Sequence, residues 1–171
     1  MSELRLVKME DDQEIPSCGE ASIDSMIQKS FIKTLYKQGL AYNILVDNVL
    51  VGNCMIKFVW LEDEDADYYD EHLDFIALEI SYLAIDLRFQ KHGFGSSALN
   101  ALIQMAKQIS SELPVRFLVI NAFEKWVPWY TKAGFAPYPK KEDPRYPNCV
   151  PMRMDLIDME RVAKYTESYC S

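Results

Sequence analysis

The residues with the clearest chemical potential form the segment Gln90-Lys91-His92-Gly93-Phe94-Gly95, which follows an apolar run and precedes a helical pattern. A strand that ends in a glycine-containing turn and continues into a helix presents unpaired backbone N–H groups and the positive end of the helix dipole at one point. That arrangement suits a phosphate or pyrophosphate. Arg88, Lys91 and His92 add three potential cations in a chain that is otherwise acidic. We therefore predict a phosphate-binding loop here.

Two ligand classes fit this loop. Gly93-Phe94-Gly95-Ser96-Ser97-Ala98 matches the G-x-G-x-x-A dinucleotide fingerprint, which implies a nicotinamide or flavin cofactor. That fingerprint requires a tight turn directly after the strand and an acidic residue at the end of the next strand. Here residues 86–89 separate the strand from the loop, and the next strand ends in Asn121. The pattern Q-x-x-G-x-G instead resembles the acyl-CoA pyrophosphate loop of the GNAT superfamily of N-acetyltransferases, and we prefer this interpretation.

A second motif lies where that resemblance requires it. Tyr130-Thr131-Lys132-Ala133-Gly134-Phe135 resembles the Y-x-x-x-G-F end of the short helix that follows the next strand in GNAT enzymes. The resemblance implies acetyl-CoA as co-substrate and direct transfer to an amine, with Tyr130 supplying a proton to the departing thiolate. The strand Glu79-Ile80-Ser81-Tyr82-Leu83-Ala84-Ile85 resembles that of histone acetyltransferases, and Glu79 occupies the place of their general base. If strict alternation holds, Glu79 shares a face with Ser81, Leu83 and Ile85.

The resemblance also implies a set of donor-binding residues. The backbone of residues 83–85 would pair with the pantetheine arm like an added strand, and the loop would hold the pyrophosphate through its N–H groups. The full set is Leu83, Ala84, Ile85, Arg88, Gln90, Lys91, His92, Gly93, Phe94, Gly95, Ser96 and Asn121. Asn121 is included because many members have an asparagine seven residues before the tyrosine, where this chain has Phe123. Trp126, Pro128 and Trp129 are candidates for an acceptor pocket, and no metal site is expected.

The N-terminal half carries a narrower resemblance. Cys18-Gly19, Ile23-Asp24 and Ile27 resemble the opening of GNAT toxins from toxin–antitoxin pairs, which acetylate aminoacyl-tRNA. Three functions therefore stay open: acetylation of a small-molecule or peptide amine, which we prefer; a toxin with tRNA and an antitoxin as partners; and a non-catalytic acyl-CoA-binding module.

Composition limits the partners. With 18 basic and 26 acidic residues among 171, the chain carries a net charge of −8, which repels nucleic acids and anionic membranes and favours a cationic or neutral acceptor. The acidic insert at residues 62–74 could attract such an acceptor, but we favour a solvated loop for it. The first residues do not resemble a signal peptide, and the four cysteines are widely spaced. We expect a cytoplasmic protein with reduced thiols. These features are compatible with a homodimer.

The pattern of apolar residues predicts one α/β domain over residues 1–171, with a GNAT-like mixed central sheet flanked by helices. Asp47-Asn48 is a turn candidate between two of the strands. The expected strands cover residues 4–9, 41–46, 49–60, 75–86, 115–121, 135 onward and 150–157. The expected helices cover residues 22–39, 96–111 and 123–133, with Gly39 ending the first. Because the helix at 96–111 separates two apolar strands, we expect those strands to be parallel.

Overall fold

The computed structural model describes residues 3–11, 16–62, 74–139, 147–158 and 160–164. Its strands are β1 (Leu4–Lys8), β2 (Leu40–Val46), β3 (Val49–Glu62), β4 (Asp74–Ile85), β5 (Val115–Phe123), β6 (Ala136–Pro137) and β7 (Cys149–Asp155). Its labelled helices are α1 (Ala21–Gln28), α2 (Ser30–Leu35), α3 (Phe94–Glu112) and α4 (Val127–Lys132), with short 3₁₀ turns η1 (Leu87–Phe89) and η2 (Glu124–Trp126), and residues 160–164 are also helical. The expected acidic insert lies outside the described residues except for Glu62 and Asp74 at its ends.

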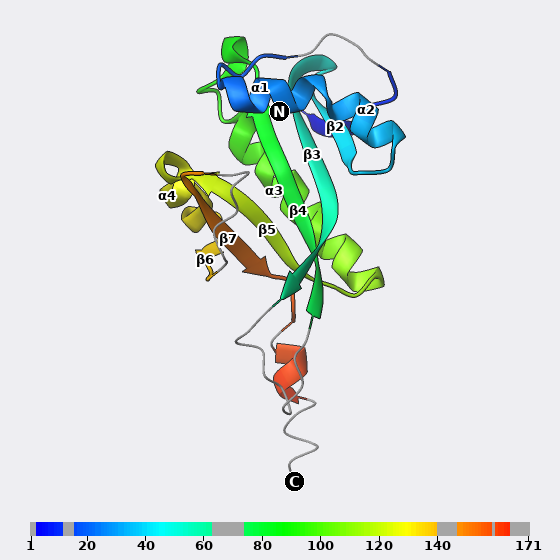
Figure 1. The fold of residues 1–171 in the computed structure, drawn as a ribbon, viewed down its shortest axis with the longest axis vertical. Helices are drawn as coiled ribbons and strands as arrows, with labels where there is room; N and C mark the ends of the chain where they lie inside the picture. Colours follow the sequence, from blue (N-terminus) through cyan, green and yellow to red (C-terminus); the bar gives the residue numbers. More distant parts are fainter. Residues whose placement is uncertain (1–2, 12–15, 63–73, 140–146, 159, 165–171) are drawn as a thin grey trace.

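These strands form one seven-stranded sheet in the order β1-β2-β3-β4-β5-β7-β6 (Figure 1). β4 and β5 are parallel, as expected from the helix between them, and the other described neighbours are antiparallel. The turn between β2 and β3 is also confirmed, because Asp47 and Asn48 take φ of 49° and 67°, the left-handed pair of a tight hairpin. The predicted mixed α/β sheet flanked by helices is therefore confirmed.

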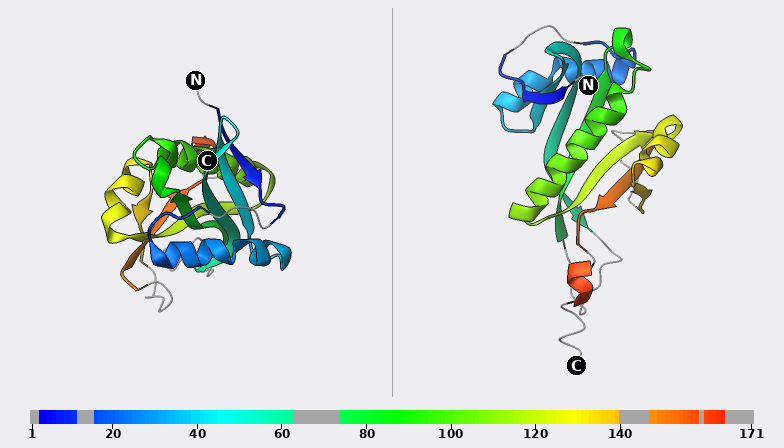
Figure 2. Two further views of the ribbon diagram at one scale, coloured as in Figure 1. Left: turned by 90° about the horizontal axis from the view of Figure 1, so that it is seen from above. Right: turned by 180° about the vertical axis from the view of Figure 1, so that it is seen from behind.

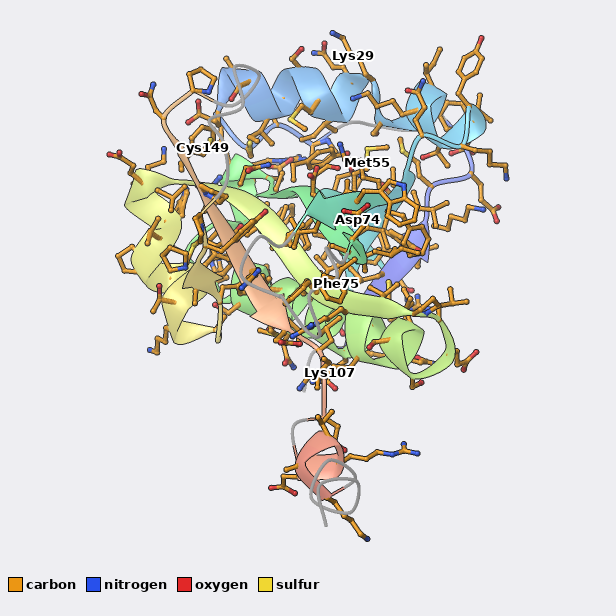
Figure 3. All side chains as sticks on the ribbon, turned by 60° about the horizontal axis from the view of Figure 1, so that its bottom comes forward. Lys29, Met55, Asp74, Phe75, Lys107 and Cys149 are labelled. Carbon is orange, nitrogen blue, oxygen red and sulfur yellow. The ribbon has the colours of Figure 1, made fainter. Side chains whose placement is uncertain are left out.

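Helices cover both faces of the sheet: α3 lies on one face, and α1 and α2 lie on the other (Figure 2). The larger core forms under α3, where Leu99, Leu102 and Ile103 pack against residues such as Leu78 and Ile80 of β4. A smaller cluster forms under α1, where Ile27, Met55, Tyr82 and Ala84 meet. In Figure 3, Met55 lies beneath α1, whereas Lys29 lies on its outer side. β4 is therefore covered on both of its faces.

The first predicted helix, residues 22–39, is wrong as a single helix. It is divided at Lys29, where the Ser30 hydroxyl donates to the Ile27 carbonyl at 2.7 Å, and α2 ends at Leu35. Gly39 does not cap it, since Lys37 takes the left-handed conformation with φ of 59°. A Cβ on Gly39 would lie 2.7 Å from the Met55 side chain, so this glycine permits close packing on β3.

The predicted helix at 123–133 also begins later than expected. β5 continues through Phe123, η2 follows, and α4 starts only at Val127. Pro128 stands in the first turn of α4, where the missing N–H of a proline costs nothing.

β4 contains an extra residue that decides which side chains share a face. Met55 is opposite Tyr82 and Ile56 is opposite Ile80, so Ser81 is unpaired in a β-bulge. Leu83 packs into the core under α3, whereas Ala77, two residues from Glu79, packs on the other face of the sheet. The expected shared face of Glu79 with Leu83 and Ile85 is therefore wrong, because the bulge reverses the alternation between them.

The pairing of β4 with β5 ends at the same level. It runs from Ile76 with Val115 to Glu79 with Val119. Beyond that level β4 stays paired with β3, and β5 stays paired with β7. The two parallel strands separate toward their C-terminal ends (Figure 1). A gap opens between them just beyond the bulge.

Candidate active site

A cavity of about 540 Å³ lies at this gap. It is bounded by β4 from Ser81 to Ile85, by β5 from Ile120 to Phe123, by the loop before α3, and by α4. Most of the predicted site residues line it: Leu83, Ala84, Ile85, Gln90, Lys91, Gly93, Phe94, Gly95, Ser96, Asn121 and Tyr130. Glu79, Arg88 and His92 are not among the lining residues. Of the three acceptor-pocket candidates, Trp126 and Trp129 line it as well, and Pro128 does not.

The cavity edge of β4 offers backbone hydrogen-bonding groups. The Asp86 N–H donates to the Val51 carbonyl of β3 at 2.9 Å, and Ala84 is opposite Asn53. Because backbone groups alternate in direction along a strand, those of Leu83 and the N–H of Ile85 point toward the gap left by β5. An extended ligand in the gap could pair with this edge as an added strand.

The loop before α3 forms a concentrated set of N–H donors. Gly93 precedes the helix with φ of 83°, and the helix N-terminus has no side-chain cap. The N–H groups of the first helical turn have no partner within the helix, and the dipole of this 19-residue helix favours negative charge beside them. Lys91 brings an ammonium group to the same wall of the cavity. The site therefore has the donors that a pyrophosphate requires.

The other two predicted cations have different roles in the loop. The Arg88 guanidinium makes two bonds to the Asp86 carboxylate, Nε to Oδ1 at 3.0 Å and a terminal nitrogen to Oδ2 at 2.9 Å. This pairing lowers the pKa of Asp86. His92 is exposed, with Nδ1 2.7 Å from the Gln90 carbonyl oxygen and its ring stacked on Phe94. Both side chains stabilise the loop from outside the cavity.

Tyr130 lies in α4 at the opposite wall from β4. Its ring packs against Trp129 and Phe135, with centroids 4.7 Å and 5.6 Å away. Burial raises the pKa of its hydroxyl well above the ordinary value of 10, so the phenol is protonated at neutral pH. Among the described residues the hydroxyl has no hydrogen-bond partner. It is a proton donor available to a molecule in the cavity.

Glu79 is buried outside the cavity, and its carboxylate is paired with Lys57 at 3.1 Å. The Ser81 hydroxyl lies 3.5 Å from the same carboxylate oxygen. Ser81 lines the main cavity and also a second one of about 130 Å³ beside Lys57. The bulge therefore makes Ser81 the connection between Glu79 and the gap.

Sequence reasoning did not place the N-terminal segment in the site. Cys18, Gly19, Glu20 and Ile23 form a wall of the cavity. The Gln90 amide holds this wall in place, donating to the carbonyl of Cys18 at 2.9 Å and to that of Ile85 at 3.0 Å. Burial raises the pKa of the Cys18 thiol to about 11, so the thiol is neutral. The contact joins residues far apart in the chain, and no local pattern predicts it.

The model of a family described as "Acetyltransferase (GNAT) family" matches residues 5–135. No curated protein matches the chain. Among solved structures, the fold is similar to a bacterial toxin with TM-score 0.76 and 18% identity, covering 98% of this chain and 97% of that one. It is also similar to a mutant of the toxin AtaT bound to the C-terminus of the antitoxin AtaR and acetyl-CoA, with TM-score 0.71, 17% identity and coverage of 93% and 97%.

AtaT complexed with acetyl-methionyl-tRNAfMet is a third similar structure, with TM-score 0.69, 16% identity and coverage of 87% and 94%. These likenesses concern the fold.

No described helix is both long and apolar enough to cross a membrane.

Proposed function

We propose that this chain, which belongs to the GNAT family of acetyltransferases, moves the acetyl group of acetyl-CoA to a primary amine in the cavity between β4 and β5. The observation that carries this proposal is the meeting of two features in one cavity. The free edge of β4 suits an extended amide chain, and the N-terminus of α3 suits a pyrophosphate. Acetyl-CoA contains both groups, joined in that order.

The described residues fit this donor. Leu83 and Ile85 would hold its pantetheine arm through their backbone, and Gly93 to Ser96 with Lys91 would hold its phosphates. Gln90 would act indirectly by fixing the wall at Cys18. The donor supplies an activated thioester, and what remains for the protein is to position an amine and to manage two protons.

Tyr130 is the proposed source of the proton for the thiolate. Its hydroxyl is neutral, is held by a ring packed between two aromatics, and lies in the cavity wall. The N–H of Leu83, pointing into the gap, is the proposed hydrogen-bond donor to the thioester carbonyl.

Glu79 is the proposed acceptor of the proton that the amine loses, acting through the Ser81 hydroxyl because Glu79 itself does not line the cavity. Glu79→Gln and Ser81→Ala should then lower kcat to a similar extent, about tenfold or more. Lys57→Met is the matched control, since it removes the ion pair without removing the relay. A normal kcat in Ser81→Ala would remove this route.

Binding of the donor is tested by thermal unfolding with acetyl-CoA, and with NADH and NADPH in parallel. A ligand at 100 times its Kd stabilises the folded state by about 2.7 kcal/mol. We expect stabilisation by acetyl-CoA alone, and stabilisation by a nicotinamide cofactor alone would overturn the proposal. Release of free thiol on addition of alkylamines, peptides and Met-tRNA then tests transfer. Binding without thiol release for every acceptor would indicate a non-catalytic acyl-CoA-binding module.

A second candidate acceptor is the α-amine of an aminoacyl-tRNA. It is favoured by the similarity to toxins over nearly the whole length of both chains, one of them solved with acetyl-methionyl-tRNAfMet. Expression in bacteria tests it: growth arrest that depends on Tyr130, with acetylated aminoacyl-tRNA in the cells, would establish a toxin and imply an antitoxin partner. Normal growth with acetylation of small amines would exclude it.

A further inference from the structure

One ion pair bridges the two sides of the gap. The Glu20 carboxylate, at the start of α1, lies 3.3 Å from the Lys125 ammonium in η2, directly after β5. Both residues line the cavity. Among the described lining residues, Glu20 supplies the sole carboxylate. The negative side-chain charge that could attract a cationic acceptor among the described lining residues is therefore concentrated at Glu20.

The backbone that carries Glu20 is firmly held. Asp24 accepts hydrogen bonds from the Ser17 hydroxyl at 2.7 Å and from the Cys18 N–H at 2.8 Å. The Leu87 N–H donates to the Ser17 carbonyl at 2.9 Å, and Gln90 holds Cys18 from the other side. The segment before Glu20 is thus fixed to the C-terminal end of β4, and its carboxylate is preorganised at the rim of the cavity.

The ion pair itself is easily exchanged. The two side chains keep 43% and 62% of their surface exposed, for Glu20 and Lys125 respectively. Pairs this exposed contribute about 0.2 to 1 kcal/mol, because water and salt screen them. An incoming ammonium group can therefore replace Lys125 at little cost, and it would find a carboxylate already in position.

The position of Glu20 indicates which part of an acceptor it would meet. α1 and α3 lie on opposite faces of the sheet (Figure 2), so an acceptor approaching from the α1 face avoids the phosphate loop at α3. The Gln90 amide joins the carbonyl of Cys18, two residues before Glu20, to that of Ile85, and Ser81 lies four residues before Ile85 on β4, a span of about 13 Å at about 3.3 Å per residue. Glu20 follows the segment held at this end of β4, so it is placed for a group other than the amine that reacts beside Ser81. A second ammonium group on the same acceptor could reach Glu20.

We propose that Glu20 is the specificity-determining residue for a second ammonium group of the acceptor, so that this enzyme prefers diamines, polyamines or lysine-like amines over monoamines, with Lys125 as the counter-ion that the acceptor displaces. This inference rests on the proposed function, since it concerns the acceptor of the same cavity.

Calorimetry tests the inference without any acetyl transfer, by titrating spermidine and 1-aminobutane into the protein saturated with CoA. Glu20→Gln should weaken spermidine binding about fivefold and leave 1-aminobutane unaffected. Lys125→Met should strengthen spermidine binding, because it frees the carboxylate. Glu112→Gln is the matched control, since it makes the same charge change at an exposed residue at the far end of α3.

The outcomes separate the two proposals. Equal weakening of both amines in Glu20→Gln, or weakening of spermidine in both Glu20→Gln and Lys125→Met, would reduce the pair to a structural contact and overturn the inference. Higher kcat/KM for Met-tRNA in Glu20→Gln would also overturn it, because removing a negative charge helps only an anionic acceptor. Binding of spermidine as expected, with no acetyl transfer to any amine, would refute the proposed function instead.

Discussion

Replacing Tyr130 with phenylalanine separates the chemistry of its hydroxyl from the packing of its ring. Phenylalanine keeps the ring contacts to Trp129 and Phe135. The hydroxyl that is lost has no partner among the described residues, so its removal should change the free energy of unfolding by less than about 0.5 kcal/mol. Loss of a general acid should lower kcat about 10²-fold, which corresponds to about 2.7 kcal/mol of transition-state stabilisation.

The assay combines thiol release, to obtain kcat and KM, with thermal unfolding in the presence of acetyl-CoA, to follow donor binding. Because burial raises the pKa of Tyr130, its proton remains in place as pH rises past the ordinary value of 10. The wild-type rate should therefore show no loss from Tyr130 ionisation below that pH. Donor stabilisation should be equal in wild type and Tyr130→Phe.

Tyr82→Phe is the matched control, because Tyr82 lines the same cavity but its hydroxyl bonds to the Asn53 side chain. We expect it to lose about 1 to 2 kcal/mol of stability, since a buried acceptor is left unpaired, and to keep kcat within about threefold. A kcat of Tyr130→Phe within about threefold of wild type would refute the assignment. So would an equal loss of kcat in both variants.

Three further predictions concern the loop, the sheet and the dependence on pH. Gly93→Ala should cost about 1 to 2 kcal/mol of stability, because φ is +83°, and should abolish stabilisation by acetyl-CoA although a Cβ there meets no protein atom within 4 Å. Gly52→Ala should cost about 2 to 4 kcal/mol in urea unfolding, because its Cβ would collide with the Ala84 carbonyl. Asp86→Asn should cost about 1 to 2 kcal/mol at pH 7 and progressively less as pH falls below 3.8. Arg88 lowers the pKa of Asp86 below 3.8, so this stabilisation is complete above that value and is lost as pH falls through the lower folded value.

Each of these has a contrary result. Retained acetyl-CoA stabilisation in Gly93→Ala would show that the phosphates lie elsewhere. A loss below about 0.5 kcal/mol in Gly52→Ala would show that β3 and β4 can separate there at no cost. A difference between Asp86→Asn and wild type that stays constant from pH 7 to pH 3 would show that the carboxylate acts by packing and not by charge.

The features that could be predicted from sequence are those fixed by neighbouring residues. Asp47-Asn48 forms the turn because both residues tolerate positive φ, and the helix predicted over 96–111 begins slightly earlier, at Phe94, directly after Gly93. The division of the first helix at Lys29 could not be foreseen, since the apolar spacing continues and only the side-chain bond from Ser30 to Ile27 marks the break.

Prediction of the site from sequence was likewise limited to features that neighbouring residues determine. The loop and Tyr130 belong to short motifs and meet in one cavity as expected. The predicted face of Glu79 was wrong because the bulge at Ser81 depends on the register of β4 with β3, which no local pattern encodes. The wall around Cys18 was missed because Gln90 reaches it across the chain, and a glutamine in a loop motif gives no sign of that contact.

The separation of β4 from β5 divides the sheet into two half-sheets, β1 to β4 and β5 to β7, joined in the sheet by the pairs between Ile76 and Glu79. A donor lying in the gap would connect the two half-sheets, because it would hydrogen-bond to β4 of the first and pack against β5 of the second. Binding at the gap should therefore stiffen both halves against relative bending. Slower amide hydrogen exchange in β7, whose residues do not line the cavity, would be evidence of this stiffening.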